Sequence, residues 1–176
     1  MERPILFVLL LYRRIRYGYA FRRIALAQGK YAIVDPEDYE RLSKYKWRVC
    51  FSRYTYYAQR AVRVGKKWTS VMMHREIIKV GDDMVVDHIN HNGLDNRKAN
   101  LRAATIAQNA WNRRRSKSRF MGMRWDKQMR RWQVVVSHQG KREHIGYFDD
   151  KIKAARAYDR AARKYHGEFA VLNFKP

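Results

Sequence analysis

Residues 85–109 of this chain, VVDHINHNGLDNRKANLRAATIAQN, combine carboxylate, imidazole and amide side chains that together could hydrolyse a phosphodiester bond. That reaction needs a deprotonated water, neutralisation of charge on the phosphate and stabilisation of the leaving oxygen. A divalent cation held by one carboxylate and one amide oxygen meets the second and third needs. A neutral histidine can act as general base for the first. Asp87, Asn109 and His88 supply these three side chains.

A strand and a loop must deliver the first part of this set. The run VVDHI predicts a strand end that carries Asp87 and His88. Neighbouring residues on a regular strand point to opposite faces, so the strand must end or bulge there if both side chains act at one site. The following NHNGLDN predicts a loop, because asparagine and aspartate tolerate left-handed backbone and Gly93 is permissive.

A helix must deliver the remaining ligand. Thr105 is followed three residues later by Gln108, which predicts a capping box. The helix would begin at Ile106 and hold Asn109 near its first turn, so that Asn109 and Asp87 can meet in space. A plainer interpretation stays open at this point, because asparagine-rich turns are common and an adjacent Asp–His pair is weak evidence for catalysis.

The composition narrows the class of partner. The 176 residues have room for one medium domain or two small ones, and 46% hydrophobic content is typical of a globular fold. The 39 lysines and arginines exceed the 16 acidic residues by 23. This excess favours a polyanionic partner, with nucleic acid as the first candidate. A ribosomal or packaging protein would share this balance. The single cysteine, Cys50, excludes an internal disulfide and a cysteine-rich zinc finger.

The spaced pattern D-H-I-N-x-x-x-x-D-N-R-x-x-N-L-R-x-x-T-x-x-Q-N resembles HNH homing endonucleases of the phage and intron type. With the upstream YAIVDPEDYERLSKYKW and MMHRE, the resemblance covers about residues 24–112. It implies a ββα-metal fold in which His88 is the general base and Asp87 and Asn109 bind one Mg²⁺ or Mn²⁺. Asn100 would brace the loop or orient His88 by hydrogen bonding.

Other polar residues around the motif have plainer interpretations. His91 follows His88 by three residues, but the resemblance makes it a variable loop residue that could touch phosphate. His74 is predicted to pack under the catalytic strand or to contact the backbone. The remaining neighbours are predicted turn formers, with Arg97 also a candidate phosphate contact: Asp95, Asn96 and Arg97.

Residues 120–176 predict a different architecture. Three strands, GMRWD, RWQVVVSH and KREHIGYF, are separated by turns at QM and HQGK. A helix follows over DDKIKAARAYDRAARKY, and Asp149 or Asp150 can cap it. This predicts a three-stranded antiparallel sheet backed by one helix. The packed face of the helix is predicted from helical spacing to comprise Ile152, Ala155, Tyr158, Ala162 and Tyr165.

Residues 118–174 resemble the ethylene-response-factor DNA-binding domain of plants (Apetala-two type), most specifically in AARAYDRAARKYHGEFAVLNF. The resemblance implies that the sheet lies in the major groove and reads bases with strand side chains. Val135 and Ser137 stand where charged residues are usual, so a plant-like target sequence does not follow. Trp125 and Trp132 could contact DNA or pack within the domain. The implied DNA face comprises Arg124, Gln133, Ser137, Arg142 and His144.

Between the two resemblances lies NRRRSKSR, residues 112–119, with five basic residues and no large apolar residue. It is not expected to fold alone. A solvated linker would need no explanation, but beside a DNA-binding chain we expect a tether that follows phosphates. Its predicted phosphate contacts are Arg113, Arg114, Arg115, Lys117 and Arg119.

The N-terminal segment ILFVLLL, residues 5–11, is far shorter than the roughly 20 residues that span a bilayer, and no small-residue cleavage site follows it. We therefore expect residues 1–23 to be an extension that need not be ordered. The predicted order is that extension, an HNH nuclease domain over 24–112, a basic linker over 113–119 and a DNA-binding domain over 120–176.

Together these observations predict an α+β, metal-dependent homing endonuclease that acts as a monomer on double-stranded DNA. With one active site per monomer it would nick one strand. We expect it in the cytoplasm of a bacterial or phage-infected cell, near the nucleoid, with no membrane and no obligate protein partner. The rival interpretations are a DNA-binding regulator with an inactive HNH module and a basic RNA-associated protein.

Overall fold

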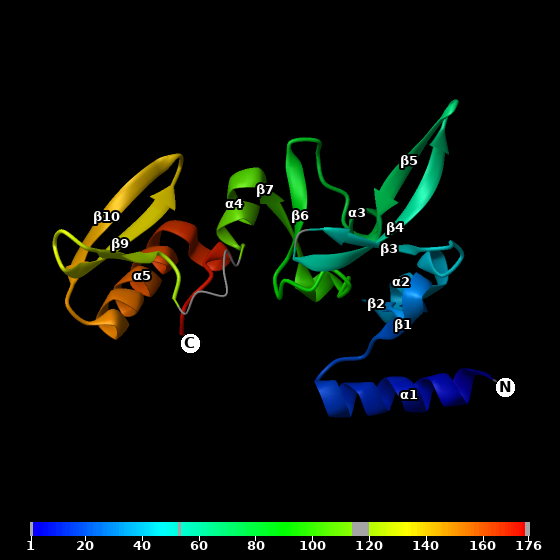
Figure 1. Ribbon diagram of the computed structural model, residues 1–176. Coiled ribbons are helices and arrows are strands. Elements are labelled where there is room, and N and C mark those ends of the chain that lie inside the picture. Colours follow the sequence, from blue (N-terminus) through cyan, green and yellow to red (C-terminus); the bar gives the residue numbers. More distant parts are fainter. Residues whose placement is uncertain (1, 53, 114–119, 175–176) are drawn as a thin grey trace. The chain divides into compact units, whose positions relative to one another are not determined.

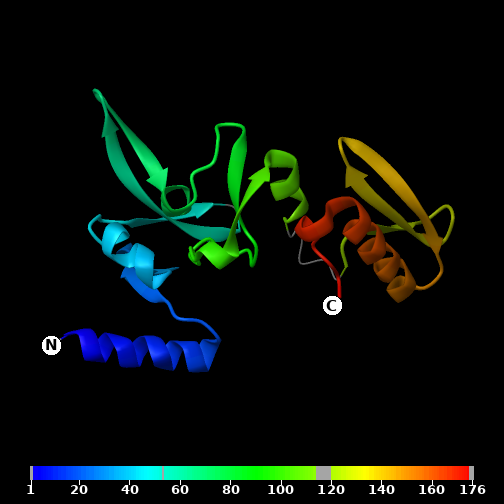
Figure 2. The same ribbon diagram turned by 180° about the vertical axis from the view of Figure 1, so that it is seen from behind.

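Two compact units make up the chain, residues 1–103 and residues 104–176. The computed structural model describes residues 2–52, 54–113 and 120–174. The predicted phosphate contacts Arg114, Arg115, Lys117 and Arg119 therefore lie outside the described residues. The chain is a mixture of helices and small antiparallel sheets (Figures 1 and 2). This confirms the α+β class in its coarse form.

The first unit combines helices with small sheets (Figure 1). Its helices are α1 (Glu2–Tyr17), α2 (Pro36–Leu42) and α3 (Met73–Ile77), with single 3₁₀ turns η1 (Ala27–Gly29) and η2 (Lys98–Asn100). Its strands are β1 (Arg22–Ala25), β2 (Tyr31–Val34), β3 (Arg48–Ser52), β4 (Thr55–Val64), β5 (Lys67–Met72) and β6 (Met84–His88). Strand β7 (Leu101–Thr105) begins in this unit and ends in the second. Strands β1 and β2 pair, as do β6 and β7, and β3, β4 and β5 form one sheet in that order.

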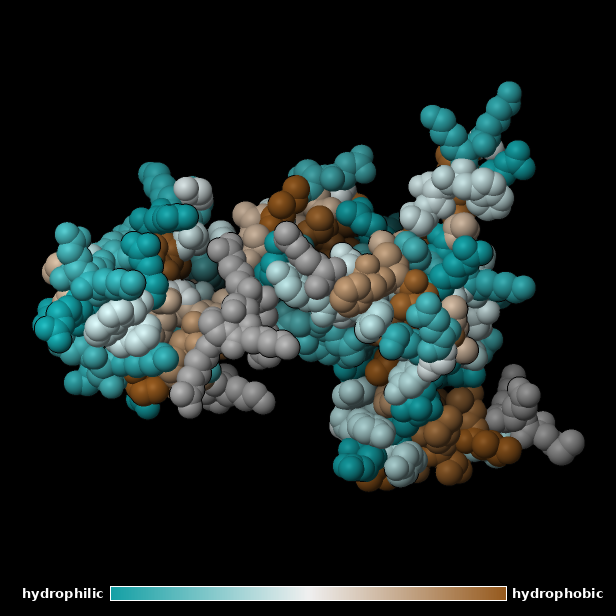
Figure 3. Space-filling model, in the orientation of Figure 1, coloured by the Kyte–Doolittle hydropathy of each residue, from teal (hydrophilic) through white to brown (hydrophobic). Residues whose placement is uncertain are grey.

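Helix α1 occupies most of the segment for which the sequence predicted an extension that need not be ordered. Its apolar side chains are mostly exposed, and Figure 3 shows them as a hydrophobic surface. At its C-terminal end Arg13 donates a hydrogen bond of 2.5 Å to the Phe21 carbonyl and lies over the Phe21 ring. The contact joins α1 to the start of β1, which begins at Arg22. Among the described residues, no helix is both long enough and apolar enough to cross a membrane.

The core of the first unit lies between the β1–β2 pair, α2 and the inner half of β4. Trp47 contributes the largest side chain, and its indole N–H donates to the Leu42 carbonyl at 2.8 Å. Helix α2 starts at Pro36, whose fixed φ suits a first helical position. The buried apolar residues are Ile24, Leu26, Ala32, Val34, Leu42, Trp47, Ala58 and Met73.

The second unit contains α4 (Ile106–Trp111), β8 (Met123–Asp126), β9 (Arg131–His138), β10 (Lys141–Phe148), α5 (Lys151–His166) and η3 (Gly167–Phe169). Its sheet has the order β10-β9-β8 and is antiparallel. Helix α5 starts as predicted behind Asp150, whose carboxylate accepts the Lys153 N–H at 2.7 Å. Strands β9 and β10 have the predicted bounds.

Helix α5 packs against the sheet mainly through small residues. Val134 and Val136 of β9 meet Ala154, Ala161 and Ala162, together with Tyr158. The prediction that Ile152 belongs to the packed face is wrong, since 41% of it is exposed. Successive helical residues are turned by about 100°, which places Ile152 away from the stripe through Ala154 and Ala161. The predicted packed face followed the larger side chains and therefore did not include Ala154 and Ala161.

Candidate active site

Asp87 lies near the end of β6 and is 5% exposed. Pairing of β6 with β7 brings Arg102 to it, and the guanidinium atoms Nε and Nη2 each lie 2.9 Å from Oδ2. The ion pair fixes the direction of the carboxylate. Carboxylate oxygen suits a hard divalent cation, which would bind Asp87 through Oδ1 or would take the place of the guanidinium.

His88 is the last residue of β6 and is 6% exposed. Its Nε2 lies 3.5 Å from Oδ1 of Asn96, at the long end of hydrogen bonding. Asn96 is fully buried, and its backbone N–H donates to the Ile33 carbonyl at 2.7 Å. A neutral imidazole that donates from Nε2 carries its basic lone pair on Nδ1. Contacts of this kind are often long before substrate binds and shorten afterwards.

Two more rings enclose the His88 imidazole. The ring centre of His74, on α3, lies 5.1 Å away and that of Tyr57, on β4, lies 5.6 Å away, both edge-to-face. Edge-to-face packing is the favoured arrangement of such rings. Of the two predicted roles for His74, the structure shows packing, here against His88 itself.

Burial keeps both imidazoles neutral. The pKa of His74 is lowered to about 3, chiefly by burial, with smaller contributions from the neighbouring His88 and Arg75. Burial also lowers the pKa of His88, an effect that the hydrogen bond to Asn96 and the charge of Asp87 partly offset. A neutral histidine beside an acidic residue is the form that can accept a proton.

Asn100 braces the loop that follows His88. Its Oδ1 accepts the Asn90 N–H at 3.0 Å, and its Nδ2 donates to the Asp95 carbonyl at 2.7 Å. The backbone adds a bond from Ile89 N–H to the Asn100 carbonyl at 2.9 Å. The geometry therefore matches the first of the two predicted roles, bracing of the loop, while a part in catalysis stays a prediction.

The loop is also tied down by Asp95 and Arg97. Arg97 Nε and Nη2 donate to the two Asp95 carboxylate oxygens at 2.7 and 2.6 Å, and this ion pair raises the pKa of Arg97. The guanidinium also lies 3.4 Å over the Tyr19 ring. The predicted phosphate contact of Arg97 would require it to leave these partners. His91 has left-handed backbone (φ 64°), as expected of a turn residue.

Gly93 lets the loop pack closely against β4. The sequence predicted Gly93 only as a flexible loop residue, so this packing role was missed. A Cβ at this position would lie 2.5 Å from the Tyr56 carbonyl oxygen and 2.6 Å from ring atoms of Tyr57. The Gly93 N–H donates to Thr55 Oγ1 at 3.1 Å. The loop can therefore approach the His88 enclosure this closely only with glycine there.

The predicted capping box is confirmed. Thr105 Oγ1 accepts the Gln108 N–H at 3.2 Å, and Gln108 Oε1 accepts the Thr105 N–H at 2.8 Å. Helix α4 starts at Ile106 and carries Asn109. Asn109 belongs to the second unit, and its convergence with Asp87 on one cation stays a prediction. In the part of the chain that the structure describes, no three His, Cys, Asp or Glu side chains cluster as metal ligands, and the predicted pair contains only one such residue.

The five residues of the predicted DNA face share one side of the β8–β9–β10 sheet. Val134 and Val136 point toward α5, so Gln133 and Ser137 point away from it. The register pairs Arg124 with Gln133, Arg142 with Ser137 and His144 with Val135, and paired residues share a face. Their contact with DNA stays a prediction.

Two hydrogen bonds cross this face. Arg124 Nε donates to Gln133 Oε1 at 2.6 Å, and Gln133 Nε2 donates to the Tyr147 hydroxyl at 3.2 Å. The two tryptophans belong to the opposite face. Trp132 packs beside the buried core, and Trp125, 47% exposed, lies edge-on to it.

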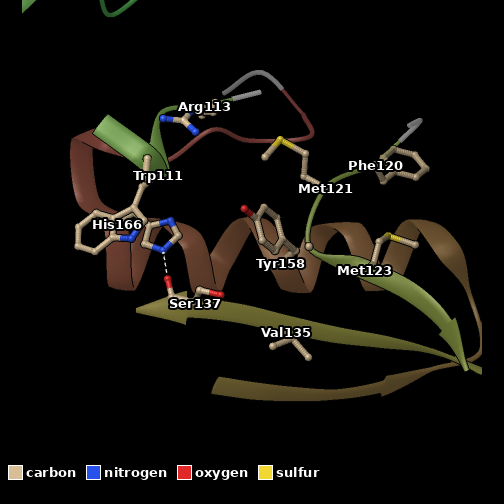
Figure 4. Close-up of a pocket in the computed structure, with 11 residues that line it drawn as sticks. Trp111, Arg113, Phe120, Met121, Met123, Val135, Ser137, Tyr158 and His166 are labelled. Carbon is tan, nitrogen blue, oxygen red and sulfur yellow. Dashed lines mark hydrogen bonds between the residues drawn. The ribbon is translucent and has the colours of Figure 1, made fainter. Parts of the chain in front are cut away.

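A pocket of about 200 Å³ lies within the second unit (Figure 4). Trp111 of α4 stacks on His166 of α5, with ring centres 4.7 Å apart and planes 10° apart. His166 Nε2 is 2.8 Å from the Ser137 carbonyl oxygen. These contacts join α4 to the second unit, which explains why the compact units divide at residue 103. Arg113 and Ser137, two predicted DNA contacts, line this pocket.

Known proteins resemble this chain in sequence. The sequence model of a family described as HNH endonuclease matches residues 79–111. "Uncharacterized HNH endonuclease L560" of Acanthamoeba polyphaga mimivirus is 31% identical over 155 residues, 87% of this chain and 80% of the relative. "Protein 3.8" of Escherichia phage T7 is 34% identical over 88 residues, 48% of this chain and 72% of the relative.

Plant relatives match a shorter stretch. "AP2-like ethylene-responsive transcription factor At1g16060" of Arabidopsis thaliana is 39% identical over 62 residues, which is 35% of this chain but only 17% of the relative. Its likeness to this chain therefore concerns a small part of the plant protein. No solved structure matches the chain significantly.

Proposed function

This chain belongs to the HNH endonuclease family, and we propose that it is a homing-type endonuclease that hydrolyses a phosphodiester bond of double-stranded DNA. The observation that carries the proposal is the His88 imidazole. It lies beside Asp87 at the end of β6, is kept neutral by burial, and faces Asn96 through Nε2. The order β6, β7, α4 supports a ββα-metal unit.

In the proposed reaction, each side chain has a separate task. His88 accepts the proton of the attacking water at Nδ1, while Asn96 accepts the N–H of Nε2 and keeps the ring in that tautomer. Arg102 holds the direction of Asp87, and Asn100 keeps the loop closed over the site. One Mg²⁺ or Mn²⁺ held by Asp87 and Asn109 would neutralise charge on the phosphate and on the leaving oxygen.

Two observations support DNA as the substrate, the positive charge of the chain and its likeness to DNA-binding relatives. The excess of 23 positive charges favours a polyanion. Relatives named as AP2-like transcription factors support residues 120–176 as a DNA-binding domain, with Arg124, Gln133, Ser137, Arg142 and His144 toward the bases. The basic segment 113–119 would follow phosphates. We place the nuclease domain at 24–112 and expect a monomer that nicks one strand, near the nucleoid of an infected cell.

Incubation with supercoiled plasmid that carries the DNA flanking the gene's own insertion site tests the proposal. We expect open-circular product with Mg²⁺ and none with EDTA. Asn109→Ala should reduce nicking while binding to the same DNA in EDTA stays unchanged. Gln133→Ala with Arg142→Ala should lose preference for the site yet keep weak nicking of other DNA.

Two results would contradict parts of this account. Selective binding without nicking by the wild type, under any divalent cation, would support the alternative function of a DNA-binding regulator with an inactive HNH module. Equal site preference of wild type and the Gln133/Arg142 variant would remove the sheet of the second unit as the main reader.

A further inference from the structure

Strands β4 and β5 form a two-stranded ribbon that extends beyond the rest of their sheet (Figure 1). Strand β3 pairs with β4 only over Thr55–Gln59, whereas β5 pairs with β4 from Gln59 to Val64. We call residues 61–70 the β4–β5 ribbon. Both its faces are largely open to solvent, with Val64 65% and Trp68 70% exposed. Val64 pairs with Lys67 and Trp68 pairs with Arg63, so each face of the ribbon exposes one large apolar side chain beside a cation.

The surroundings of the ribbon are strongly cationic. Residues 41–75 contain no aspartate or glutamate, and the ribbon itself carries Arg63, Lys66 and Lys67 near its tip. At its base Arg60 is already neutralised by Glu76, with Nε 2.5 Å from Oε1. The tip appears hydrophilic in Figure 3. The cations at the tip therefore meet no carboxylate nearby in the sequence, and an anionic partner complements them.

The shape of the ribbon fits a DNA groove. Paired strands lie about 4.8 Å apart, and a B-DNA major groove about 12 Å wide admits a two-stranded β-ribbon. The register puts Arg63 opposite Trp68 and Ala61 opposite Ser70, and paired residues share a face. One face thus presents a guanidinium and a hydroxyl, which are groups that contact bases and phosphates, beside the Trp68 indole.

We propose that the β4–β5 ribbon enters the major groove of double-stranded DNA, so that the first unit contacts DNA through an element of its own. The choice of DNA rests on the proposed function, but the contact does not depend on cleavage. The deep, narrow major groove of double-stranded RNA cannot be entered by such an element, so the ribbon selects B-form DNA.

Binding of the full chain to the flanking-site duplex, measured by fluorescence anisotropy in EDTA at several salt concentrations, tests this. In the ribbon variant, Arg63→Gln, Lys66→Gln and Lys67→Gln are combined. Each lost phosphate contact lowers the log–log salt slope by about 0.9, so up to about 2.7 is expected. The matched control combines Lys44→Gln, Lys46→Gln and Lys79→Gln, which removes the same charge from exposed positions elsewhere in the first unit.

Equal slopes for the ribbon variant and the control would show a general charge effect and overturn the proposal. Thermal melts of both variants should match the wild type, because the replaced side chains are exposed. A greater loss of binding to single-stranded RNA than to duplex DNA would also overturn it.

Guanine methylation at N7, which blocks the major groove, locates the contact. We expect wild-type binding to show an interference patch that the ribbon variant lacks, and Trp68→Ala to weaken the same patch. An unchanged patch in both variants would contradict the proposal. Because binding is measured without a metal, wild-type protein that binds with this patch but never nicks DNA would refute the proposed nuclease and leave the ribbon contact supported.

Discussion

Oδ1 of Asn96 lies 3.5 Å from Nε2 of His88, and Asn96 has no exposed surface. Its backbone is held by the Ile33 carbonyl, in a strand far away in sequence. The position of the amide is therefore set by the core, and the imidazole is oriented against a rigid partner. This relationship links the fold of the first unit to the proposed general base.

Replacement of Asn96 by leucine, which keeps the size but removes the acceptor, should slow nicking on the order of 10–100-fold, as loss of an outer-shell partner commonly does. Asn96→Asp, which retains an acceptor oxygen, should keep more of the rate. DNA affinity in EDTA should not change in either variant. The measurement is the single-turnover nicking rate at saturating enzyme.

The ¹⁵N shifts of the His88 ring give an independent check. The wild type should carry its proton on Nε2, and the leucine variant should lose this preference. A wild-type ring protonated on Nδ1, or equal nicking rates for wild type and Asn96→Leu, would contradict the role given to Asn96.

Arg102→Met should expose the role of Asp87. Removing one partner of a mostly buried ion pair costs on the order of 3 kcal/mol in unfolding free energy, because the remaining charge is left uncompensated. Mg²⁺ should restore part of this loss, because a cation can replace the guanidinium. The measurement is the shift in melting temperature on adding Mg²⁺, which should be larger for Arg102→Met than for the wild type.

The matched control adds Asp87→Asn to Arg102→Met. With no carboxylate left at position 87, Mg²⁺ should no longer raise the melting temperature of this double variant. An equal Mg²⁺ response in the single and double variants would argue against Asp87 as a ligand.

His74 should make the stability of the protein depend on pH. Its pKa is lowered from 6.5 to about 3, chiefly by burial. Between these values the unfolded chain binds a proton that the folded chain does not, so acidification lowers the unfolding free energy. The unfolding free energy falls by about 1.4 kcal/mol for each pH unit below about 6.5. Above that pH nothing is lost through His74.

Urea denaturation at about pH 7.5 and about pH 5 measures this effect. His74→Phe, which preserves an aromatic ring against Tyr57 and His88, should lose less stability on acidification than the wild type. The same acid loss in both proteins would show that His74 is not held neutral by the fold.

Gly93→Ala should destabilise the first unit. The new methyl would meet the Tyr56 carbonyl and the Tyr57 ring at contact distances that force a shift, and overpacking of this kind costs about 1–3 kcal/mol. Gly140→Ala is the comparison, because nothing lies within 4 Å of its Cβ and only the left-handed backbone (φ 75°) opposes it. Urea denaturation measures both. A Gly93→Ala protein as stable as the wild type would show that the loop does not need this close approach.

Local signals predicted much of the fold. The runs RWQVVVSH and KREHIGYF located β9 and β10 with their observed bounds, and the Thr105–Gln108 spacing located the start of α4. These predictions were correct because strand preference and helix capping depend on residues that are close in the sequence. The helix over residues 2–17 was not predicted, since the run ILFVLLL at residues 5–11 contains no polar residue whose spacing could indicate a helix.

The candidate site was predictable only in part. The motif spacing identified Asp87, His88, Asn100 and Asn109, but Asn96 was predicted only to form a turn, and Tyr57 was not singled out. Their roles arise from contacts between distant segments, such as Asn96 with Ile33 and Tyr57 with His74. Arg102 was part of the matched pattern, yet only strand pairing shows that it binds Asp87.

The most direct measurement of the central claim compares wild type with His88→Ala on supercoiled plasmid that carries the flanking-site DNA, in Mg²⁺. We expect open-circular product from the wild type and a loss of rate on the order of 10²–10⁴-fold in the variant, the usual contribution of a general base. Affinity for the same DNA in EDTA should be equal for the two proteins. Equal nicking by both proteins, or no nicking by the wild type, would contradict it.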